Sequence, residues 1–220
     1  MIEALCRTLR QPARFARTIH TSRASRIVLA IMFAGSLQGC VEMVVGTAVV
    51  GAIAATDRRT LGAQTDDKAI TIKAEARVPS LIGDAGHINI ASFNRKVLLT
   101  GEVRDEATKA TVEREIGTIQ GVQGVFNELQ ILDRSNYTAR GNDALLTTKV
   151  KASFVDARDL SATAIKVVTE QATVYLMGRV TQREGQRAGD VAGGVAGVQK
   201  VIKIFEYIDE EQLRQIDKRS

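Results

Sequence analysis

The sequence has little from which a metal, redox or stacking site could be built. Its 220 residues include no Trp, only 4% aromatic residues and two cysteines. Both cysteines, Cys6 and Cys40, lie in the first fifth of the chain. The remainder therefore cannot form a disulfide framework, a CxxC redox pair or a thiolate metal site. The shortage of aromatic rings also argues against a stacking platform for bases or sugars.

An excess of charge is also missing once the start of the chain is set aside. Six of the 30 basic residues and one of the 25 acidic residues precede Cys40, which leaves 24 of each sign. A neutral body lacks the broad positive surface that nucleic-acid binding requires, so no nucleic-acid partner is expected.

The Arg-rich start is followed by an uncharged apolar run, residues 27–37, and then by Gly39-Cys40. Eleven apolar residues are too few to span a membrane and are typical of a signal peptide. The Gly-Cys junction resembles the bacterial lipobox, in which the cysteine is acylated and becomes the first residue of the mature protein. The resemblance implies a signal peptide over 1–39 and a diacylglycerol plus a fatty acyl chain on Cys40. Val41, where a retention signal would have Asp, implies the outer membrane. A buried free cysteine after an amphipathic leader is the alternative.

Two or more acyl chains hold a protein on a bilayer without help from surface charge. We expect residues 40–65 to form a lipidated linker. Within it, residues 43–55 are small and apolar but too few to span a membrane. They lie at the membrane interface or pack on the first domain, and the sequence does not choose between these.

The rest of the chain repeats itself. Residues 96–103 (KVLLTGEV) align with 173–180 (TVYLMGRV), and 121–125 (GVQGV) align with 197–201 (GVQKV). A spacing of about 76 residues in both alignments indicates two copies of one unit. We expect the copies over 66–134 and 142–208, with a linker over 135–141 and a frayed helical tail over 209–220.

Each copy is expected to be a small α+β unit with the element order αββαβ. Asp67 and Asp143 are candidate N-caps of its first helix. Alternation along the second strand of each copy predicts one buried and one outward face. A glycine at the same place in both strands, Gly101 and Gly178, suggests close packing of a helix. The expected strands are 87–92, 96–103 and 125–132 in the first copy and 164–170, 173–180 and 201–208 in the second; the expected second helices are 106–118 and 182–195. This predicts a three-stranded mixed sheet with two helices on one face.

This order, with the V-x-L-x-G-x-V strand and the later G-V-x-x-V step, resembles the BON domain. Two such units after a lipobox are similar to the dual-BON outer-membrane lipoproteins of the division- and outer-membrane-associated lipid-binding type. The resemblance implies a non-enzymatic protein, anchored on the periplasmic face of the outer membrane. It also implies that the second domain binds anionic phospholipid and that the protein supports envelope integrity, with no cofactor beyond the acyl chains on Cys40.

Charge favours the second copy as the lipid-facing one. Residues 66–134 hold 9 basic and 11 acidic side chains, whereas 142–208 hold 9 and 7. In the second copy's first helix, Leu145 lies near Lys149, which suits an interfacial helix whose lysines meet phosphates. The expected phospholipid-binding residues are Leu145, Leu146, Lys149 and Lys151. Helical spacing also places Leu146 in a stripe with Val150 and Phe154 that should face the sheet.

The same residues also fit functions other than lipid binding. Leu and Lys on a helix are also ordinary solvated-face residues, so a tethered adaptor for envelope assembly machinery, without headgroup binding, is the alternative. His87, the single histidine after Cys40, has no neighbouring Cys or acidic pattern, so we expect neither a catalytic set nor a metal site.

Overall fold

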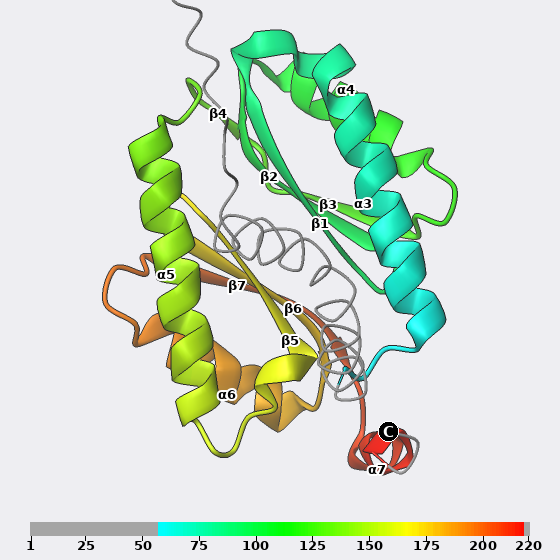
Figure 1. The fold of residues 1–220 in the computed structure, drawn as a ribbon, viewed down its shortest axis with the longest axis vertical. Helices are drawn as coiled ribbons and strands as arrows, with labels where there is room; N and C mark the ends of the chain where they lie inside the picture. Colours follow the sequence, from blue (N-terminus) through cyan, green and yellow to red (C-terminus); the bar gives the residue numbers. More distant parts are fainter. Residues whose placement is uncertain (1–56, 218–220) are drawn as a thin grey trace, which may run out of the picture. The chain divides into compact units, whose positions relative to one another are not determined.

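A computed structural model of the chain describes residues 57–217, in which the two sequence copies form two sheets, each with its own helices (Figure 1). The expected order αββαβ is confirmed in both copies. The elements of the first copy are α3 (Leu61–Ile82), a 3-10 turn (Gly83–Ala85), β1 (His87–Phe93), β2 (Lys96–Val103), α4 (Glu106–Gly117), β3 (Gly124–Asn127) and β4 (Gln130–Ile131).

The second copy repeats this order with one longer last strand. Its elements are α5 (Tyr137–Asp156), a 3-10 turn (Ala162–Ala164), β5 (Ile165–Glu170), β6 (Thr173–Val180), α6 (Gln182–Gly193) and β7 (Lys200–Tyr207), followed by a tail helix α7 (Glu210–Asp217). The tail is thus helical over most of its described length, as expected. The third strand of the first copy, in contrast, is split into β3 and β4 at Glu128 and Leu129.

Both sheets are mixed, as expected. An antiparallel hairpin, β1–β2 or β5–β6, is joined by a strand that runs parallel to the central one. The strand orders are β1-β2-β3, with β4 also on β2, and β5-β6-β7. The central strands β2 and β6 therefore pair on both sides.

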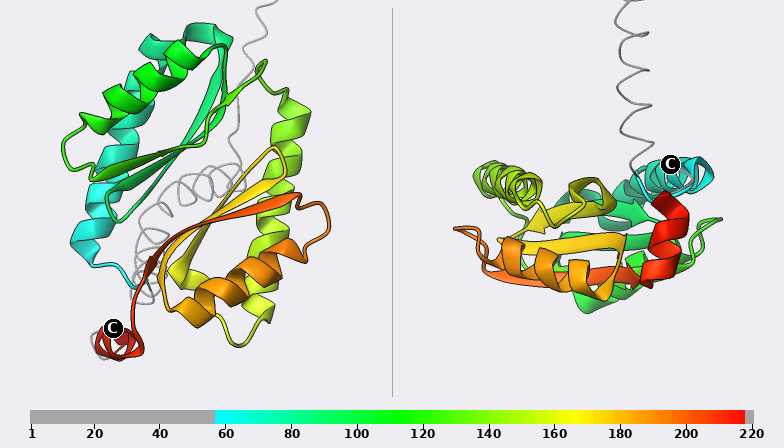
Figure 2. Two further views of the ribbon diagram at one scale, coloured as in Figure 1. Left: turned by 180° about the vertical axis from the view of Figure 1, so that it is seen from behind. Right: turned by 90° about the horizontal axis from the view of Figure 1, so that it is seen from below.

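Each sheet carries its two helices on one face (Figure 2). Apolar side chains fill the space between helices and sheet. In the first copy Ile70 and Val112 of the helices pack with Val97 and Leu99 of β2. In the second, Val150 and Phe154 of α5 pack with Val174 and Leu176 of β6. Burial at every third or fourth helical position explains why these segments form amphipathic helices over a sheet.

The prediction that only one face of the second strands is buried was wrong. Leu98 of β2 and Tyr175 and Met177 of β6 form a third cluster together with β1 and β5. Leu98 is 0% and Tyr175 2% exposed. The faces without helices therefore pack against each other, which makes four layers of helices, sheet, sheet and helices. All three clusters lie between Ile70 and Phe205, so the described part of the chain holds its own cores and can fold without residues 1–56.

The predicted N-caps were also wrong, because both helices begin earlier. Thr60 caps α3 and Asn136 caps α5 with side-chain oxygens that accept backbone amides. Asp67 and Asp143 lie inside the helices and are buried. Position along the chain alone could not reveal their partners, which are residues of the neighbouring β-hairpin.

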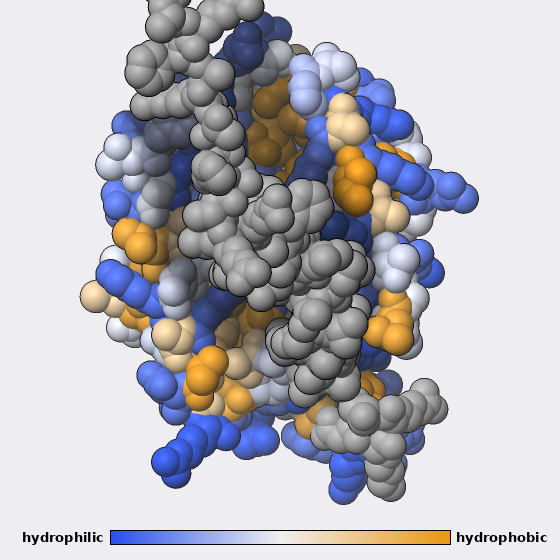
Figure 3. All heavy atoms as spheres, in the orientation of Figure 1, coloured by the Kyte–Doolittle hydropathy of each residue, from blue (hydrophilic) through white to orange (hydrophobic). Residues whose placement is uncertain are grey.

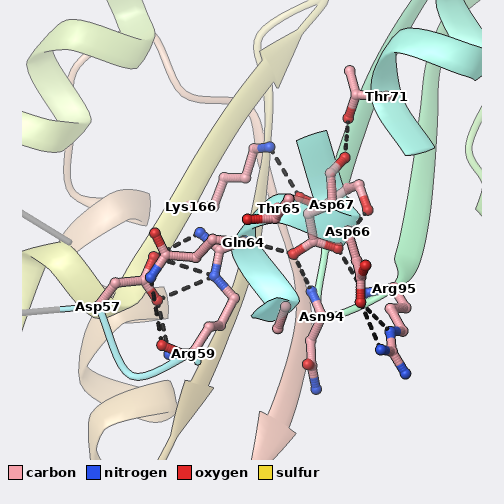
Figure 4. A network of polar contacts seen from close by, with 12 residues as sticks. Asp57, Arg59, Gln64, Thr65, Asp66, Asp67, Thr71, Asn94, Arg95 and Lys166 are labelled. Carbon is pink, nitrogen blue, oxygen red and sulfur yellow. Dashed lines mark hydrogen bonds and ion pairs between the residues drawn. The ribbon is translucent and has the colours of Figure 1, made fainter. Parts of the chain in front are cut away.

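Each buried aspartate holds the turn of its own hairpin. Asp67 accepts from the amides of Asn94 and Arg95, both at 2.7 Å (Figure 4). Asp143 accepts from the amides of Gln171 and Ala172, both at 2.9 Å. All four turn residues have positive φ, the conformation of a tight type I′ turn. The aspartates therefore accept hydrogen bonds from backbone N–H groups that a two-residue turn leaves unpaired.

The paired glycines do not make room for a helix. A Cβ on Gly101 would collide with the backbone oxygen of His87, and one on Gly178 would lie 2.5 Å from the backbone oxygen of Ala164. The close approach is therefore to the segment that enters the first strand of each hairpin. Gly101 also has a φ of 116°, which only glycine adopts without strain.

Candidate functional site

Helix α5 presents apolar and cationic side chains to solvent along one side. Leu145 is 63% and Val155 73% exposed, and Lys149 and Lys151 are exposed as well. Figure 3 shows hydrophobic residues scattered among hydrophilic ones on the side of the molecule where α5 lies. Leu145, Lys149 and Ala152 follow the i, i+4, i+7 spacing of one helical stripe, and Val155 lies one turn beyond Ala152. This arrangement is suited to the boundary between lipid headgroups and acyl chains.

Leu146 does not belong to this exposed surface. It is 7% exposed and lies with Val150 and Phe154 on the buried side of α5. The spacing-based expectation that it faces the sheet is confirmed, and the structure corrects its inclusion among lipid-contacting residues. A side chain already buried against the sheet cannot enter a bilayer unless the domain opens.

The matching helix of the first copy has a different exposed side. The residues of α3 that correspond to Leu145 and Lys151 are Ala69 and Glu75, both exposed. One large apolar residue, Ile72, is 54% exposed where α5 has Thr148. Both helices therefore expose an apolar residue beside a lysine, and α5 differs in having Leu145 and Lys151 where α3 has Ala69 and Glu75.

A cleft of about 410 Å³ opens beside α5. Its walls are α5, the edge strand β5 and the edge strand β1 of the other sheet. The charged residues that line it are His87, Arg140, Asp143, Lys166 and Glu170.

The acidic groups of the cleft are not ordinary surface carboxylates. Burial, helped by the nearby charges of Glu102 and Asp143, raises the pKa of Glu170 to about 7. Glu102, 0% exposed, accepts a hydrogen bond of 2.6 Å from the side chain of Gln171. A carboxyl group with a pKa near 7 is partly protonated at neutral pH, so the cleft is less negative than its sequence indicates.

The basic groups are perturbed in the opposite direction. Burial lowers the pKa of Lys166, whose Nζ donates to the backbone oxygen of Ser92 at 3.1 Å. Burial, and then the positive charge of Arg140, lower the pKa of His87. His87 therefore lines the cleft as a histidine that burial and a nearby arginine favour in its neutral form.

Two further findings concern the described residues only. Between Asp57 and Asp217, no three His, Cys, Asp or Glu side chains come together in a way that could hold a metal ion. No helix in this same stretch is long and apolar enough to cross a membrane. Cys40, the expected lipidation site, lies outside the described residues.

The sequence did not indicate several residues that the structure places at α5 or its cleft. Val155 could have been found, because it lies one helical turn beyond Ala152, which shares the stripe of Leu145. Tyr137 and Arg140 could not, because α5 was expected to start near Asp143. The Glu102–Glu170 pair is formed by two strands 68 residues apart, and no local pattern signals it.

The fold and the sequence together define a family. The profile described as BON domain matches residues 66–133 and 142–209. The chain therefore belongs to the BON-domain family and carries two such domains in tandem.

Two named relatives extend this result. The chain is 40% identical over 176 residues to "Outer membrane lipoprotein DolP" of Haemophilus influenzae, covering 79% of this chain and 91% of that one. It is 27% identical over 154 residues to "21 kDa hemolysin" of Actinobacillus pleuropneumoniae, covering 69% and 79%. A solved structure of CdsD, a structural protein of the type III secretion system of Chlamydia trachomatis, matches with 10% identity and a TM-score of 0.27 over 68% of this chain and 98% of that one. That likeness is too low to support a conclusion.

Proposed function

We propose that this chain is an outer-membrane lipoprotein, anchored through Cys40 on the periplasmic face, that binds anionic phospholipid through α5 and supports envelope integrity. Its role is non-enzymatic, and its partner is the membrane itself. The observation that carries the proposal is the exposure of Leu145 on α5 with Lys149 one helical turn away, and of Val155 further along the same helix. The 40% identity to a named outer membrane lipoprotein supports the location.

The physical case rests on two additive contributions. Insertion of an apolar side chain contributes about 0.8 kcal/mol per buried methylene. Each lysine near an anionic surface adds about 1 kcal/mol, which salt weakens. With the acyl anchor holding the protein at the bilayer, such modest contributions suffice to orient the second domain against it.

Vesicle sedimentation of residues 57–220 tests this directly. The fragment omits the anchor and the apolar residues 43–55, so binding reports on the folded domains alone. With phosphatidylglycerol-containing vesicles at low salt, Leu145→Glu should weaken binding at least ~30-fold, because it removes an inserted group and adds a repelled charge. Lys149→Glu should weaken it by roughly 10-fold.

Ile72→Glu on α3 is the matched control. It makes the same chemical change at a similarly exposed apolar residue of the other domain and should leave binding within twofold. Equal losses for Ile72→Glu and Leu145→Glu would contradict the assignment to α5. No vesicle binding by the unmodified fragment, together with crosslinking of the full protein to an envelope protein, would favour the tethered adaptor instead.

The anchor needs its own test. Mass spectrometry of the purified protein should find the chain beginning at Cys40 with acyl groups attached. An unmodified start with residues 1–39 retained would remove the lipoprotein assignment.

A further inference from the structure

The short segment before α3, residues 57–60, contacts the second BON domain through Arg58. Nη1 and Nη2 of Arg58 each donate to one carboxylate oxygen of Glu184 on α6, at 2.8 and 2.7 Å. Nη1 also donates to the backbone oxygen of Arg179, near the end of β6, at 3.0 Å. Arg58 thus bonds a residue 126 positions further along the chain, past the whole first domain.

The ion pair between Arg58 and Glu184 is buried, with side chains that are 8% and 7% exposed. Burial opposes ionisation of Glu184, but the hydrogen bonds from Arg58 and from the Thr181 amide outweigh it, so the pKa of Glu184 is lowered. A guanidinium that bonds both oxygens of one carboxylate holds the two groups in a defined geometry. Loss of one partner leaves a charge in a site with little water, which destabilises a protein far more than loss of an exposed pair.

Glu184 also holds the start of α6. It accepts the Thr181 amide at 2.9 Å, while Oγ1 of Thr181 accepts the Glu184 amide at 3.3 Å. This reciprocal arrangement is a capping box. Arg58 therefore bonds both the residue that caps the start of α6 and the end of the strand that precedes it.

The next residue binds the same segment to the first domain. Arg59 pairs with Asp57 at 2.6 Å and with the buried Asp67 at 2.7 Å (Figure 4). Its guanidinium also lies 4.4 Å from the centre of the Phe93 ring, which belongs to the cluster between the two sheets. Consecutive arginines therefore bind opposite domains.

The two copies differ at the matching places. Arg134 stands two residues before the N-cap of α5, as Arg58 stands two residues before that of α3, yet Arg134 is exposed. The third residue of α4 is Thr108, whereas the third residue of α6 is Glu184. The repeat thus has an arginine before each first helix, but a carboxylate at the start of the second helix in the second domain alone.

We propose that residues 57–60 form a strap that completes the second BON domain and joins it to the first, so that the two domains unfold as one unit. The second domain then depends on residues that precede the first. Residues 1–56 join the folded part at Asp57, so the strap also brings that junction to the domain that carries α5. This coupling is independent of whether α5 binds lipid.

Arg58→Gln in residues 57–220 tests the strap. It leaves Glu184 buried without its cation, so the melting temperature should fall by roughly 6 °C or more. Amide hydrogen exchange followed by NMR should accelerate at least ~10-fold at the start of α6, although the substitution precedes the first domain.

Arg187→Gln is the matched control. It removes an exposed ion pair, with Asp159 at 3.0 Å, from the same helix. It should change the melting temperature by less than about 2 °C and amide exchange by less than about twofold.

A second substitution distinguishes the ion pair from other effects of losing Arg58. Glu184→Gln removes the buried charge but keeps an acceptor for the Thr181 amide. Addition of Arg58→Gln to Glu184→Gln should therefore lower the melting temperature by less than half as much as Arg58→Gln does alone. A folded double variant beside an unfolded Arg58→Gln would support the strap in the same way.

Equal effects of Arg58→Gln and Arg187→Gln would overturn the proposal. So would faster exchange confined to the first domain. A double variant that loses as much on addition of Arg58→Gln as the unmodified fragment does, or that fails to fold together with Arg58→Gln, would also overturn it.

Discussion

The two helices that open the BON domains, α3 and α5, bury the same positions and expose different ones. Asp67, Ile70, Ala74 and Val78 are buried in α3, and Asp143, Leu146, Val150 and Phe154 are their counterparts in α5. The exposed sides share Lys73 and Lys149 but otherwise diverge, with Leu145 and Lys151 in α5 against Ala69 and Glu75 in α3. The fold thus fixes the inner side of the helix, and the outer side is free to acquire a function.

The two buried aspartates likewise share some contacts with their hairpins and differ in others. Both aspartates accept the two turn amides, but Asp67 also accepts from the Ser92 hydroxyl at 2.8 Å and pairs with Arg59 at 2.7 Å (Figure 4). Arg59 in turn stacks 4.4 Å over the Phe93 ring. The segment that enters the first domain is therefore tied into its hairpin, whereas the contacts shown for Asp143 among the described residues are the two turn amides alone.

The glycines of the central strands should give the largest effects. Gly101→Ala would place a Cβ against the His87 carbonyl at a positive φ, and we expect a loss of roughly 4 kcal/mol in the free energy of unfolding or failure to fold. Gly178→Ala, without the positive φ, should cost less, about 2–3 kcal/mol. Urea denaturation measures both. Gly124→Ala is the control, because no atom lies near the Cβ that it adds. It should change the free energy of unfolding by less than about 0.5 kcal/mol. Equal, small losses at all three positions would refute the close approach.

Substitutions of the buried aspartates should have the next largest effects on the free energy of unfolding. Asp67→Ala leaves two amides and a hydroxyl without their acceptor and removes one of the two carboxylates that pair with Arg59, and it should cost about 3 kcal/mol. Asp143→Ala leaves only two amides and should cost about 2 kcal/mol. Chemical denaturation of each single variant checks the order. If Asp143→Ala proved the more damaging, the additional contacts of Asp67 would contribute nothing to stability.

The pH dependence of stability should distinguish the second domain. The pKa of Glu170 is about 7 in the folded chain against an ordinary 4.5, so the folded state holds an extra proton between these values. The stability that the folded state gains by protonating Glu170 is therefore full below pH 4.5 and is lost as pH rises to 7. Glu170→Gln should remove this loss and be about 2 kcal/mol more stable than the unmodified protein at pH 8, with little difference at pH 4. A constant difference across that range in denaturation curves would contradict a raised pKa.

Transfer of the α5 surface to α3 should give the smallest effect. Ala69→Leu with Glu75→Lys gives the first domain the exposed residues of the second. We expect a gain of about 1 kcal/mol, or roughly fivefold, in affinity for anionic vesicles, because two side chains alone provide limited insertion. Sedimentation of residues 57–220 measures it, with Ala76→Leu and Glu106→Lys as a control placed elsewhere in the domain. A loss of affinity after the transfer would indicate that exposed leucine and lysine are ordinary solvated residues.

The sequence predicted the repeated part of the fold well because its signals are local. The alternation in 96–103 and 173–180 identified β2 and β6 to the residue, and both second helices were placed within two residues of their observed ends. The starts of α3 and α5 were misplaced because an aspartate before an apolar stripe also resembles a cap. The buried second face of β2 was missed because Thr100 and Glu102 look solvent-facing in sequence and are 0% exposed in the structure.

The amino-acid pattern by itself determined the duplication, the αββαβ unit and the core side of each helix, since each depends on neighbours along the chain. Acylation at Cys40 stays a prediction. Only the tertiary structure decided that the sheets pack face to face, that Glu102 lies near enough to raise the pKa of Glu170, and that Arg140 borders a cleft with its Nε lacking a hydrogen-bond partner among the described residues. These depend on contacts between residues far apart in sequence, where burial changes what a charged side chain does.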